Sequence, residues 1–129
     1  MSKHADLAKQ LSQALQEYTE DITESVKSGV DQVAKETDEE IRSHIIFQNR
    51  TGKYVKSFRI TETEHSRYRK VKVWHVTNGR YRLTHLLENG HALRAGGRAR
   101  AFPHIRYGEA LARKRMEEIV TEAAAKGGK

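Results

Sequence analysis

The side chains best suited to chemistry lie close together between Tyr81 and Tyr107, in the run YRLTHLLENGHALRAGGRARAFPHIRY. Histidines, one glutamate and several arginines surround a pair of glycines, which are groups that serve metal sites, acid–base catalysis or the binding of polyanions. The stretch is too polar, too basic and too rich in glycine to form a buried core. The spacing of its residues must therefore distinguish between a metal site, a catalytic site and a site that binds polyanions.

The candidate metal ligands are His85, Glu88 and His91. His85 and Glu88 could share one face of a helix, but zinc-binding helices pair two histidines four residues apart and aim a third ligand at them. The step from Glu88 to His91 crosses Gly90, which does not preset that geometry. The chain also has no cysteine, so thiolate sites and disulfides are excluded. We expect neither a metal nor another cofactor.

An enzyme built on this stretch would use Glu88 or His91 as its general base and an arginine to hold an oxyanion or a phosphate. The sequence contains no nucleophile elbow, no phosphate-binding glycine motif and no paired-carboxylate motif. Nothing in it holds a histidine against a carboxylate. We therefore predict that the protein is not an enzyme and assign no catalytic residue.

The chain has a net charge of +7, but its charged residues are unevenly distributed along the sequence. Residues 1–49 contain ten acidic and five basic residues, whereas residues 50–107 contain fourteen basic and three acidic ones. An acidic arm followed by a basic body either attracts a polyanion or joins copies of the chain head to tail. Composition alone leaves both interpretations open.

Basic side chains near aromatic or glycine residues support an interaction with nucleic acid. They form two groups, Arg67, Arg69, Lys70 and Lys72 beside Tyr68 and Trp74, and Arg94, Arg98 and Arg100 around Gly96 and Gly97. Cations of this kind contact phosphates without reading sequence. No helix-turn-helix, RNA-binding strand or zinc-finger pattern accompanies them. A basic nucleic-acid-binding or nuclease-like protein is thus one hypothesis, and a solvated strand face and loop would explain the same charges.

The first 47 residues are predicted to form one long helix, with Ser28-Gly29 as the expected position of a kink. Apolar or small side chains recur every three or four residues, at Leu7, Leu11, Leu15, Tyr18, Ile22, Val26, Val30, Val33, Thr37, Ile41 and Ile45. Their mean step is slightly above 3.6 residues, which argues against a strict heptad coiled coil. The helix would extend roughly 60 Å, so we expect it to overhang its domain and to pack on another chain; folding back on itself is the alternative.

Two strands are predicted next, because residues 54–63 and 68–77 are rich in β-branched and aromatic side chains. Asn49–Gly52 is a turn signal that ends the first helix, and Glu64-His65-Ser66 is polar enough to connect the strands. Asn78-Gly79 closes this unit or turns into a short third strand.

A short helix is expected at Tyr81–Asn89, with Leu83, Leu86 and Leu87 buried and Gly90 at its end. Gly96-Gly97 predicts a mobile loop over residues 93–101. Pro103 forces the residue before it to be extended, so residues 101–105 are expected to add a strand. The last helix is predicted over residues 107–125.

The predicted fold class is α+β, with a long N-terminal helix, an antiparallel sheet of three to four strands, a short helix and a C-terminal helix. Residues 1–129 would form a single domain, made of a helical arm (1–48), an α+β body (49–126) and a frayed tail (127–129). No apolar run is long enough for a membrane span, and the N-terminus lacks the apolar region of a secretory signal. We therefore expect no membrane contact.

Several motifs together resemble the neck or tail-completion proteins of long-tailed bacteriophages, the class that includes minor tail protein Z. The motifs are Arg50-Thr51-Gly52-Lys53-Tyr54 with Ser57, the run Tyr81–His91, Gly96-Gly97-Arg98 and Phe102-Pro103-His104-Ile105. The resemblance covers roughly residues 50–125, and the N-terminal helix is similar in character only. Tyr107 and Gly108 stand where the family often has proline and alanine at the start of the last helix.

The resemblance implies a non-enzymatic structural protein of a phage or prophage, located in the virion at the head–tail junction and in the host cytoplasm during assembly. It implies a homo-oligomeric ring around the DNA channel; we expect six copies, with twelve, or a monomer before assembly, as alternatives. Expected partners are the tail terminator or tail tube and the head-closure or adaptor proteins, with non-specific contact to genomic DNA.

Two sets of residues are predicted to form the binding site. The loop that contacts DNA or a partner contains Arg94, Gly96, Gly97, Arg98 and Arg100. The residues that support its base are His85, Glu88, Gly90, His91, Phe102, Pro103 and His104. The histidines and Glu88 are expected to act there through helix capping and hydrogen bonds.

Overall fold

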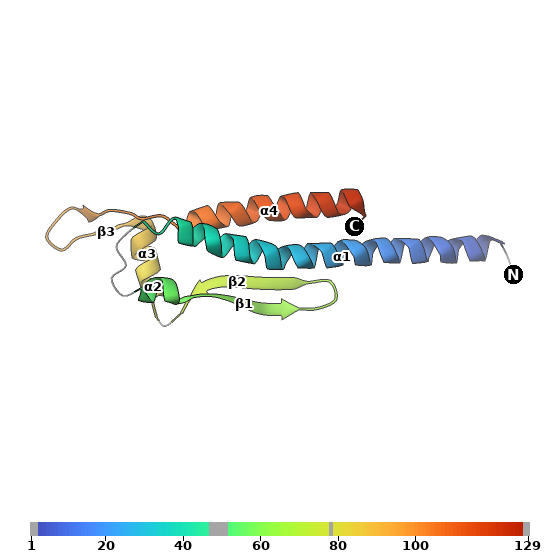
Figure 1. Cartoon of the computed structure of the whole chain (residues 1–129), viewed down its shortest axis with the longest axis horizontal. Coiled ribbons are helices and arrows are strands. Elements are labelled where there is room, and N and C mark those ends of the chain that lie inside the picture. The colour runs from blue at the N-terminus through green and yellow to red at the C-terminus, as the bar shows by residue number, and fades with distance from the viewer. Residues whose placement is uncertain (1–2, 47–51, 78, 128–129) are drawn as a thin grey trace.

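The computed structural model describes residues 3–46, 52–77 and 79–127, which form an elongated molecule (Figure 1). Its long elements are the helices α1 (Lys3–Ser43) and α4 (Ile105–Lys126) and the strands β1 (Phe58–His65) and β2 (Lys70–Val76). Its short elements are α2 (Lys53–Lys56), α3 (Tyr81–Asn89), β3 (His91–Ala92) and β4 (Arg98–Ala99). The short elements gather at the end where α1 finishes (Figure 1). Residues 49–51, Asn78 and residues 128–129, for which turns and fraying were predicted, lie outside the described residues.

Helix α1 confirms the long N-terminal helix, and it continues without a break through Ser28-Gly29, where a kink was predicted. Gly29 has a packing role instead. A β-carbon at Gly29 would lie 2.5 Å from Cγ2 of Ile119, a distance that no carbon pair tolerates. The missing side chain therefore lets α4 approach α1 closely.

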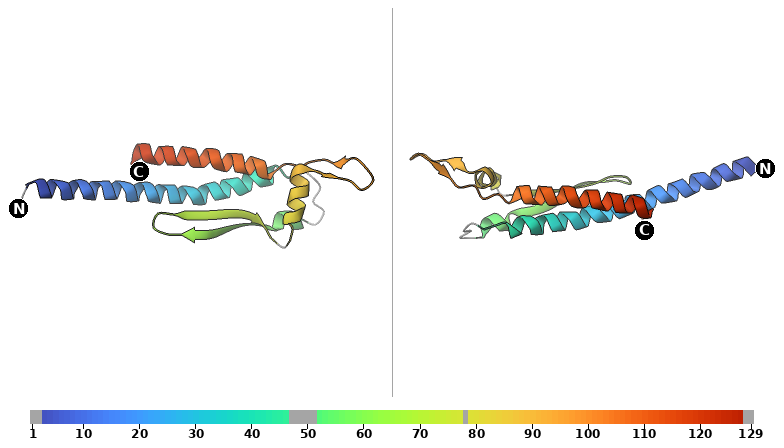
Figure 2. Two further views of the ribbon diagram at one scale, coloured as in Figure 1. Left: turned by 180° about the vertical axis from the view of Figure 1, so that it is seen from behind. Right: turned by 90° about the horizontal axis from the view of Figure 1, so that it is seen from above.

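Helices α1 and α4 lie side by side and antiparallel (Figure 2). Near the start of α4 the rings of His44 and Tyr107 stack with their centroids 3.8 Å apart. Near its end the Tyr18 hydroxyl donates a 2.8 Å hydrogen bond to the carbonyl oxygen of Ala124. The part of α1 before Tyr18 extends beyond α4, and Leu7, Leu11 and Leu15 there are 64%, 60% and 59% exposed. We refer to residues 3–17 as the overhang.

Strands β1 and β2 form an antiparallel hairpin whose register runs from Phe58 opposite Val76 to His65 opposite Lys70, with a bulge between Glu62 and Glu64. The hairpin runs beside α1, with β2 next to the helix (Figure 1), and β2 also lines a groove together with α4. Strand β1 is exposed from its second residue onward, because β2 stands between it and α1.

The core lies where α1, α2 and the start of β1 meet. Ile41, Tyr54 and Phe58 are at most 3% exposed, and Ile45, Val55, Trp74, Val76 and Leu87 pack around them. The rings of Phe58 and Trp74 meet edge to face with centroids 4.7 Å apart, and the indole Nε1 of Trp74 donates a 2.9 Å hydrogen bond to Asp38. These contacts fix the base of the hairpin against α1.

The prediction of one sheet with three to four strands is wrong, because the described residues form two separate two-stranded sheets, β1–β2 and β3–β4. The first predicted strand began at residue 54, but residues 53–56 form the helical turn α2, which follows Gly52 at a φ of 69°. Residues 101–105 do not form a strand; α4 already begins at Ile105. The start of α4 is stabilised by a cap from another element, described below.

The short helix α3 has the predicted bounds, but its predicted buried side is only partly covered. Leu87 packs against the core, whereas Leu83 is 39% and Leu86 43% exposed. Helix α3 crosses the end of the molecule (Figure 1) and contacts β2 over few residues, which leaves the outer leucines in solvent.

Candidate partner-binding site

The predicted arginine loop is a short hairpin that projects from one end of the molecule (Figure 1). Its strands pair His91 with Ala99 and Ala92 with Arg98. Leu93 N–H donates to the Gly97 carbonyl at 3.0 Å, and Gly96 N–H donates to the Leu93 carbonyl at 3.1 Å. Because of these hydrogen bonds, the loop is more ordered than we predicted from Gly96-Gly97. The tip nevertheless packs on nothing, since a β-carbon on either glycine would meet no atom within 4 Å.

The three arginines of this hairpin are not paired with acidic groups of the described residues. Arg94, Arg98 and Arg100 are exposed, and none forms an ion pair with a residue in the described part of the chain. The Arg100 guanidinium lies 5.2 Å from the centre of the Phe102 ring, a cation–π contact that leaves its charge uncompensated. The hairpin therefore carries a concentrated positive charge at the end of the molecule.

Gly90 joins this hairpin to α3, with a φ of 71° that disfavours any other residue. A β-carbon at this position would lie 2.6 Å from the carbonyl oxygen of Ala99. Phe102 N–H donates a 2.6 Å hydrogen bond to the Leu87 carbonyl, which ties the returning strand to the end of α3. Both the backbone angle and the close crossing of the two segments require glycine here.

Glu88 provides the N-terminal cap of α4, although it belongs to α3. Its Oε1 accepts hydrogen bonds from the backbone N–H groups of His104 at 2.9 Å and Ile105 at 3.0 Å. Its Oε2 accepts from the backbone N–H of Arg106 at 3.1 Å and from the Arg106 side chain at 3.0 Å. Helix α4 has no capping side chain of its own, so Glu88 satisfies amides that every helix start leaves without partners.

The electrostatics of Glu88 follow from this geometry. Burial alone would raise the pKa of the carboxyl group, but the amides of His104, Ile105 and Arg106 and the Arg106 side chain together lower the pKa below its usual value. The start of a helix also carries partial positive charge, which favours a carboxylate at this place. Glu88 is therefore an ionised anchor between α3 and α4.

His104 is fully buried beside Glu88 and links it to Tyr54. The His104 Nδ1 lies 2.8 Å from the Phe102 carbonyl and 3.3 Å from Glu88 Oε1. Because both of these atoms are acceptors, the proton is assigned to Nδ1, and Nε2 then accepts from the Tyr54 hydroxyl at 2.7 Å. The Tyr54 oxygen also lies 3.0 Å from the Thr84 hydroxyl. This chain of hydrogen bonds joins α2, α3 and the start of α4.

Replacing Tyr54 by phenylalanine is expected to lower the free energy of unfolding by about 1–3 kcal/mol, because it removes the donor to a buried imidazole nitrogen while preserving the ring. Burial raises the pKa of the Tyr54 hydroxyl, so the group is a neutral donor at physiological pH. Urea denaturation monitored by circular dichroism measures the change. Tyr18→Phe is the matched control: that hydroxyl also donates a hydrogen bond, but the side chain is 46% exposed. Equal losses for the two variants would contradict the role of the buried chain.

The other residues predicted to support the loop base, His85, His91 and Pro103, have smaller roles in it. His85 is exposed, and the Nδ1 of His91 is buried without a hydrogen-bond partner among the described residues. Pro103 is half-buried between Phe102 and His104. No group of three His, Asp or Glu side chains within the described ranges is arranged to hold a metal ion.

The basic residues of the β1–β2 hairpin are engaged by acidic residues, unlike those of the β3–β4 hairpin. Lys70 and Lys72 both contact Asp31 of α1, at 2.8 and 2.7 Å, and they lower the pKa of Asp31 to about 2. Arg67 contacts Glu20 of α1 at 2.6 Å. These cations attach the hairpin to the acidic helix.

Sequence reasoning missed Tyr54, Thr84 and Arg106 as parts of the loop base. Tyr54 lies in the run Arg-Thr-Gly-Lys-Tyr and Arg106 directly follows the Phe-Pro-His-Ile segment. Their closeness to motif residues was the available signal, but the contacts span 18 to 50 positions in the sequence. Only the tertiary fold brings them together.

None of the helices in the described ranges has the length and apolar character that a membrane span requires. No curated protein and no solved structure matches the chain significantly. A family model does match: residues 9–90 fit the family described as "Bacteriophage HK97-gp10, putative tail-component".

The matched region includes α1 from residue 9, the β1–β2 hairpin and α3, and it ends at Gly90. It thus covers the N-terminal helix, which the sequence motifs matched only in character, and stops before the arginine hairpin and α4. The resemblance to phage tail proteins is therefore confirmed at the level of the family. Because the match extends over more than half of its length, the chain belongs to the HK97-gp10-like family of bacteriophage tail components.

Proposed function

We propose that this protein is a non-enzymatic subunit of a ring at the head–tail junction, a neck or tail-completion protein that joins tails to DNA-filled heads. The family places the chain among phage tail components, which work in contact with other phage structural proteins. The narrower position at the junction is the hypothesis, and its support comes from the shape and charge of the molecule.

The observation that carries the proposal is that the two ends of the molecule differ. The exposed leucines of the overhang lie at one end, and the β3–β4 hairpin with its uncompensated arginines lies at the other (Figure 1). A subunit with two different binding ends associates head to tail, and such contacts close into a ring when the rotation between subunits permits. We propose six copies in the ring, with twelve as the alternative.

The arginine hairpin is the proposed contact with a partner outside the ring. Arg94, Arg98 and Arg100 face solvent along the hairpin, on a base held rigidly by Glu88 and His104. A cationic tip on a rigid base suits an acidic surface of a tail terminator, tail tube, head-closure or adaptor protein. It suits equally the phosphates of genomic DNA in the channel, which need only cations within reach.

The nuclease-like alternative receives less support from the contacts. Both carboxylate oxygens of Glu88 accept hydrogen bonds from the start of α4, so using Glu88 as a general base would uncap a helix. Arg67, Lys70 and Lys72 are held by α1 and form no open cationic strand face. The arginine hairpin is more open, but its arginines form no ion pair with a carboxylate among the described residues.

Changing Arg94, Arg98 and Arg100 together to alanine is expected to leave DNA-filled heads and complete tails unjoined, because the hairpin loses its charge while its backbone ladder remains. Electron microscopy of lysates from phage carrying the variant counts free full heads and free tails, and plaque assays measure infectivity. We expect at least a tenfold loss of infectious particles.

The control removes the same charge from another surface, by changing Arg113, Lys114 and Lys126 of α4 to alanine. These side chains are exposed, and the ion pairs of Arg113 and Lys126 lie within one helix, so joining should stay close to normal. Unchanged joining in the hairpin variant would refute the proposed contact. Particles that lack tails altogether would place the protein in tail tube assembly instead.

A further inference from the structure

The overhang of α1 continues an apolar stripe that is buried elsewhere in the same helix. Along the stripe the exposed fraction falls from 64% at Leu7 and 59% at Leu15 to 4% at Val33 and 1% at Ile41. The covered part packs against α4 and the core, and the coverage by α4 ends beside Tyr18. The overhang therefore presents the same kind of surface with nothing on it.

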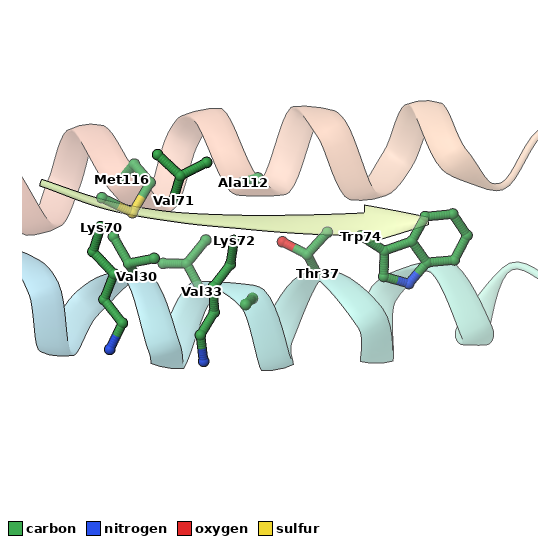
Figure 3. Close-up of a pocket in the computed structure, with 10 residues that line it drawn as sticks. Val30, Val33, Thr37, Lys70, Val71, Lys72, Trp74, Ala112 and Met116 are labelled. Carbon is green, nitrogen blue, oxygen red and sulfur yellow. The ribbon is translucent and has the colours of Figure 1, made fainter. Parts of the chain in front are cut away.

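The body of the molecule carries a concave apolar groove, whereas the leucines of the overhang project from a helix. The groove lies between α1, α4 and β2 and is lined mainly by apolar side chains, among them Val30, Val71, Ala112 and Met116 (Figure 3). Its volume is about 340 Å³. These four side chains are only half-buried, so the groove is open to solvent. The hydroxyl of Thr37, which also lines it, has no hydrogen-bond partner among the described residues.

The sizes of the two surfaces agree. A cavity of about 150 Å³ holds one benzene-sized group, so the groove has room for about two leucine side chains. Leu11 and Leu15 lie one helical turn apart, about 6 Å along the axis. The groove follows Val30 to Thr37 of α1, which is about 10 Å of helix. Two successive leucines of the overhang therefore match its length.

An overhang that fills this groove must come from a second copy of the chain. Leu15 lies 18 residues before Val33 in an unbroken helix, which separates the two by about 27 Å, so the overhang cannot reach its own groove. Charge does not oppose the contact, because Lys9 and Glu17 are the only ionisable residues between positions 7 and 17 and cancel each other. One overhang and one groove per chain also give equal numbers of both surfaces.

We propose that the overhang of one copy docks in the α1–α4–β2 groove of the next copy, with Leu11 and Leu15 as its anchors. The proposal rests on the self-association in the proposed function, and not on the position of the protein in the virion. Because the two surfaces differ, the contact is heterologous and propagates around a ring. The same apolar stripe would then be covered along its whole length, by α4 within a copy and by the groove of the neighbour.

The chain has no cysteine, so disulfide cross-linking tests the contact directly. Full-length Leu11→Cys and Ala112→Cys variants are mixed and oxidised, and non-reducing gels measure the covalent dimer. We expect at least tenfold more dimer than with Ala110→Cys, an exposed position on α4 that does not line the groove. A disulfide needs the two Cα atoms within about 7 Å, and each chain carries one cysteine, so every link joins two chains.

A second variant measures the association without cross-linking. Changing Leu7, Leu11 and Leu15 to serine should abolish oligomers in sedimentation velocity, while the thermal unfolding midpoint stays within a few degrees because these side chains are largely exposed. Dimers formed through Leu11→Cys on both chains, without any link to Ala112→Cys, would show that overhangs pair with each other and would overturn the proposal. Oligomers that survive the triple serine change would also overturn it. Head–tail joining does not enter either measurement, so the two proposals can fail separately.

Discussion

Replacing Glu88 by glutamine is expected to lower the free energy of unfolding by about 2–3 kcal/mol, although the shape of the side chain is preserved. One amide oxygen can still accept from His104 and Ile105, but the NH₂ group then faces the N–H groups of Arg106. The variant therefore loses two hydrogen bonds and the carboxylate charge at the start of α4, each worth about 1 kcal/mol or more at such a site. Chemical denaturation of both proteins at pH 7 measures the loss.

The pH dependence of this loss provides an independent test. The pKa of Glu88 is lower in the folded protein than its ordinary value, so the stabilisation is fully present above the unfolded pKa, about 4.3. It disappears as the pH falls through the lower folded value. The difference between the wild type and Glu88→Gln should thus shrink below about pH 4.3. A difference that stays constant down to pH 2.5 would show that the charge of Glu88 contributes nothing.

Glu109→Gln is the matched control for this change. Glu109 also lies near the start of α4, but it is 69% exposed, and the ion pair it forms is with Arg113, at 3.4 Å within the same helix. Surface pairs of this kind contribute about 0.5 kcal/mol or less. A loss of stability as large as that of Glu88→Gln would assign the effect to charge near α4 in general, and not to the cap from α3.

Gly108 sets the distance between α1 and α4, and Gly108→Ala is expected to destabilise the protein by about 1–2 kcal/mol. A β-carbon at Gly108 would lie 2.4 Å from Cγ1 and 2.7 Å from Cδ1 of Ile41, which is 1% exposed and held in the core. Overpacking of this kind costs about 1–3 kcal/mol, and it outweighs the gain of roughly 1 kcal/mol that alanine brings to a helix interior. Thermal and urea denaturation measure the net change.

A double-mutant cycle with Ile41→Ala separates the clash from the other effects of the substitution. Ile41→Ala alone should cost about 2–5 kcal/mol, because it opens a cavity in the core. In that background the two Ile41 atoms that would clash with the new methyl group are gone, and the remaining neighbour is Cγ2 of Thr37 at 3.3 Å, so Gly108→Ala should become stabilising. The sign of its effect should therefore reverse. If Gly108→Ala stabilises both backgrounds, the two helices are not in the close contact described here.

The helices of this protein could be read from local patterns. The three- and four-residue spacing of apolar side chains predicted α1, and a glycine after a short apolar helix predicted the C-terminal end of α3. The β1–β2 hairpin was predicted from its β-branched and aromatic residues, apart from the helical turn at Lys53–Lys56. These features depend on residues that are neighbours in sequence, and therefore their signals are contained in short windows.

The candidate site could be located from the sequence, but its internal roles could not be assigned. The run from Tyr81 to Tyr107 was recognised as one functional unit, and its motifs pointed to phage tail proteins, a family that the match over residues 9–90 confirms. Glu88 was expected in the loop base but was not identified as the cap of α4. That role depends on placing α3 across the start of a helix sixteen or more residues later, which no local pattern encodes.

By itself, the sequence determined the long helix, the basic and acidic halves and the position of the arginine loop, since composition and periodicity carry these properties directly. The kinship with phage tail components came from the resemblance of its motifs, and the match over residues 9–90 shows the family. Only the tertiary structure decided which charges are free. Lys70 and Lys72 look as available in the sequence as Arg94 and Arg98, yet the first pair lies against Asp31 and the second has no acidic partner among the described residues. The physical reason is that an ion pair depends on distance in space. The fold of the hairpin onto α1 sets that distance, and separation along the chain does not.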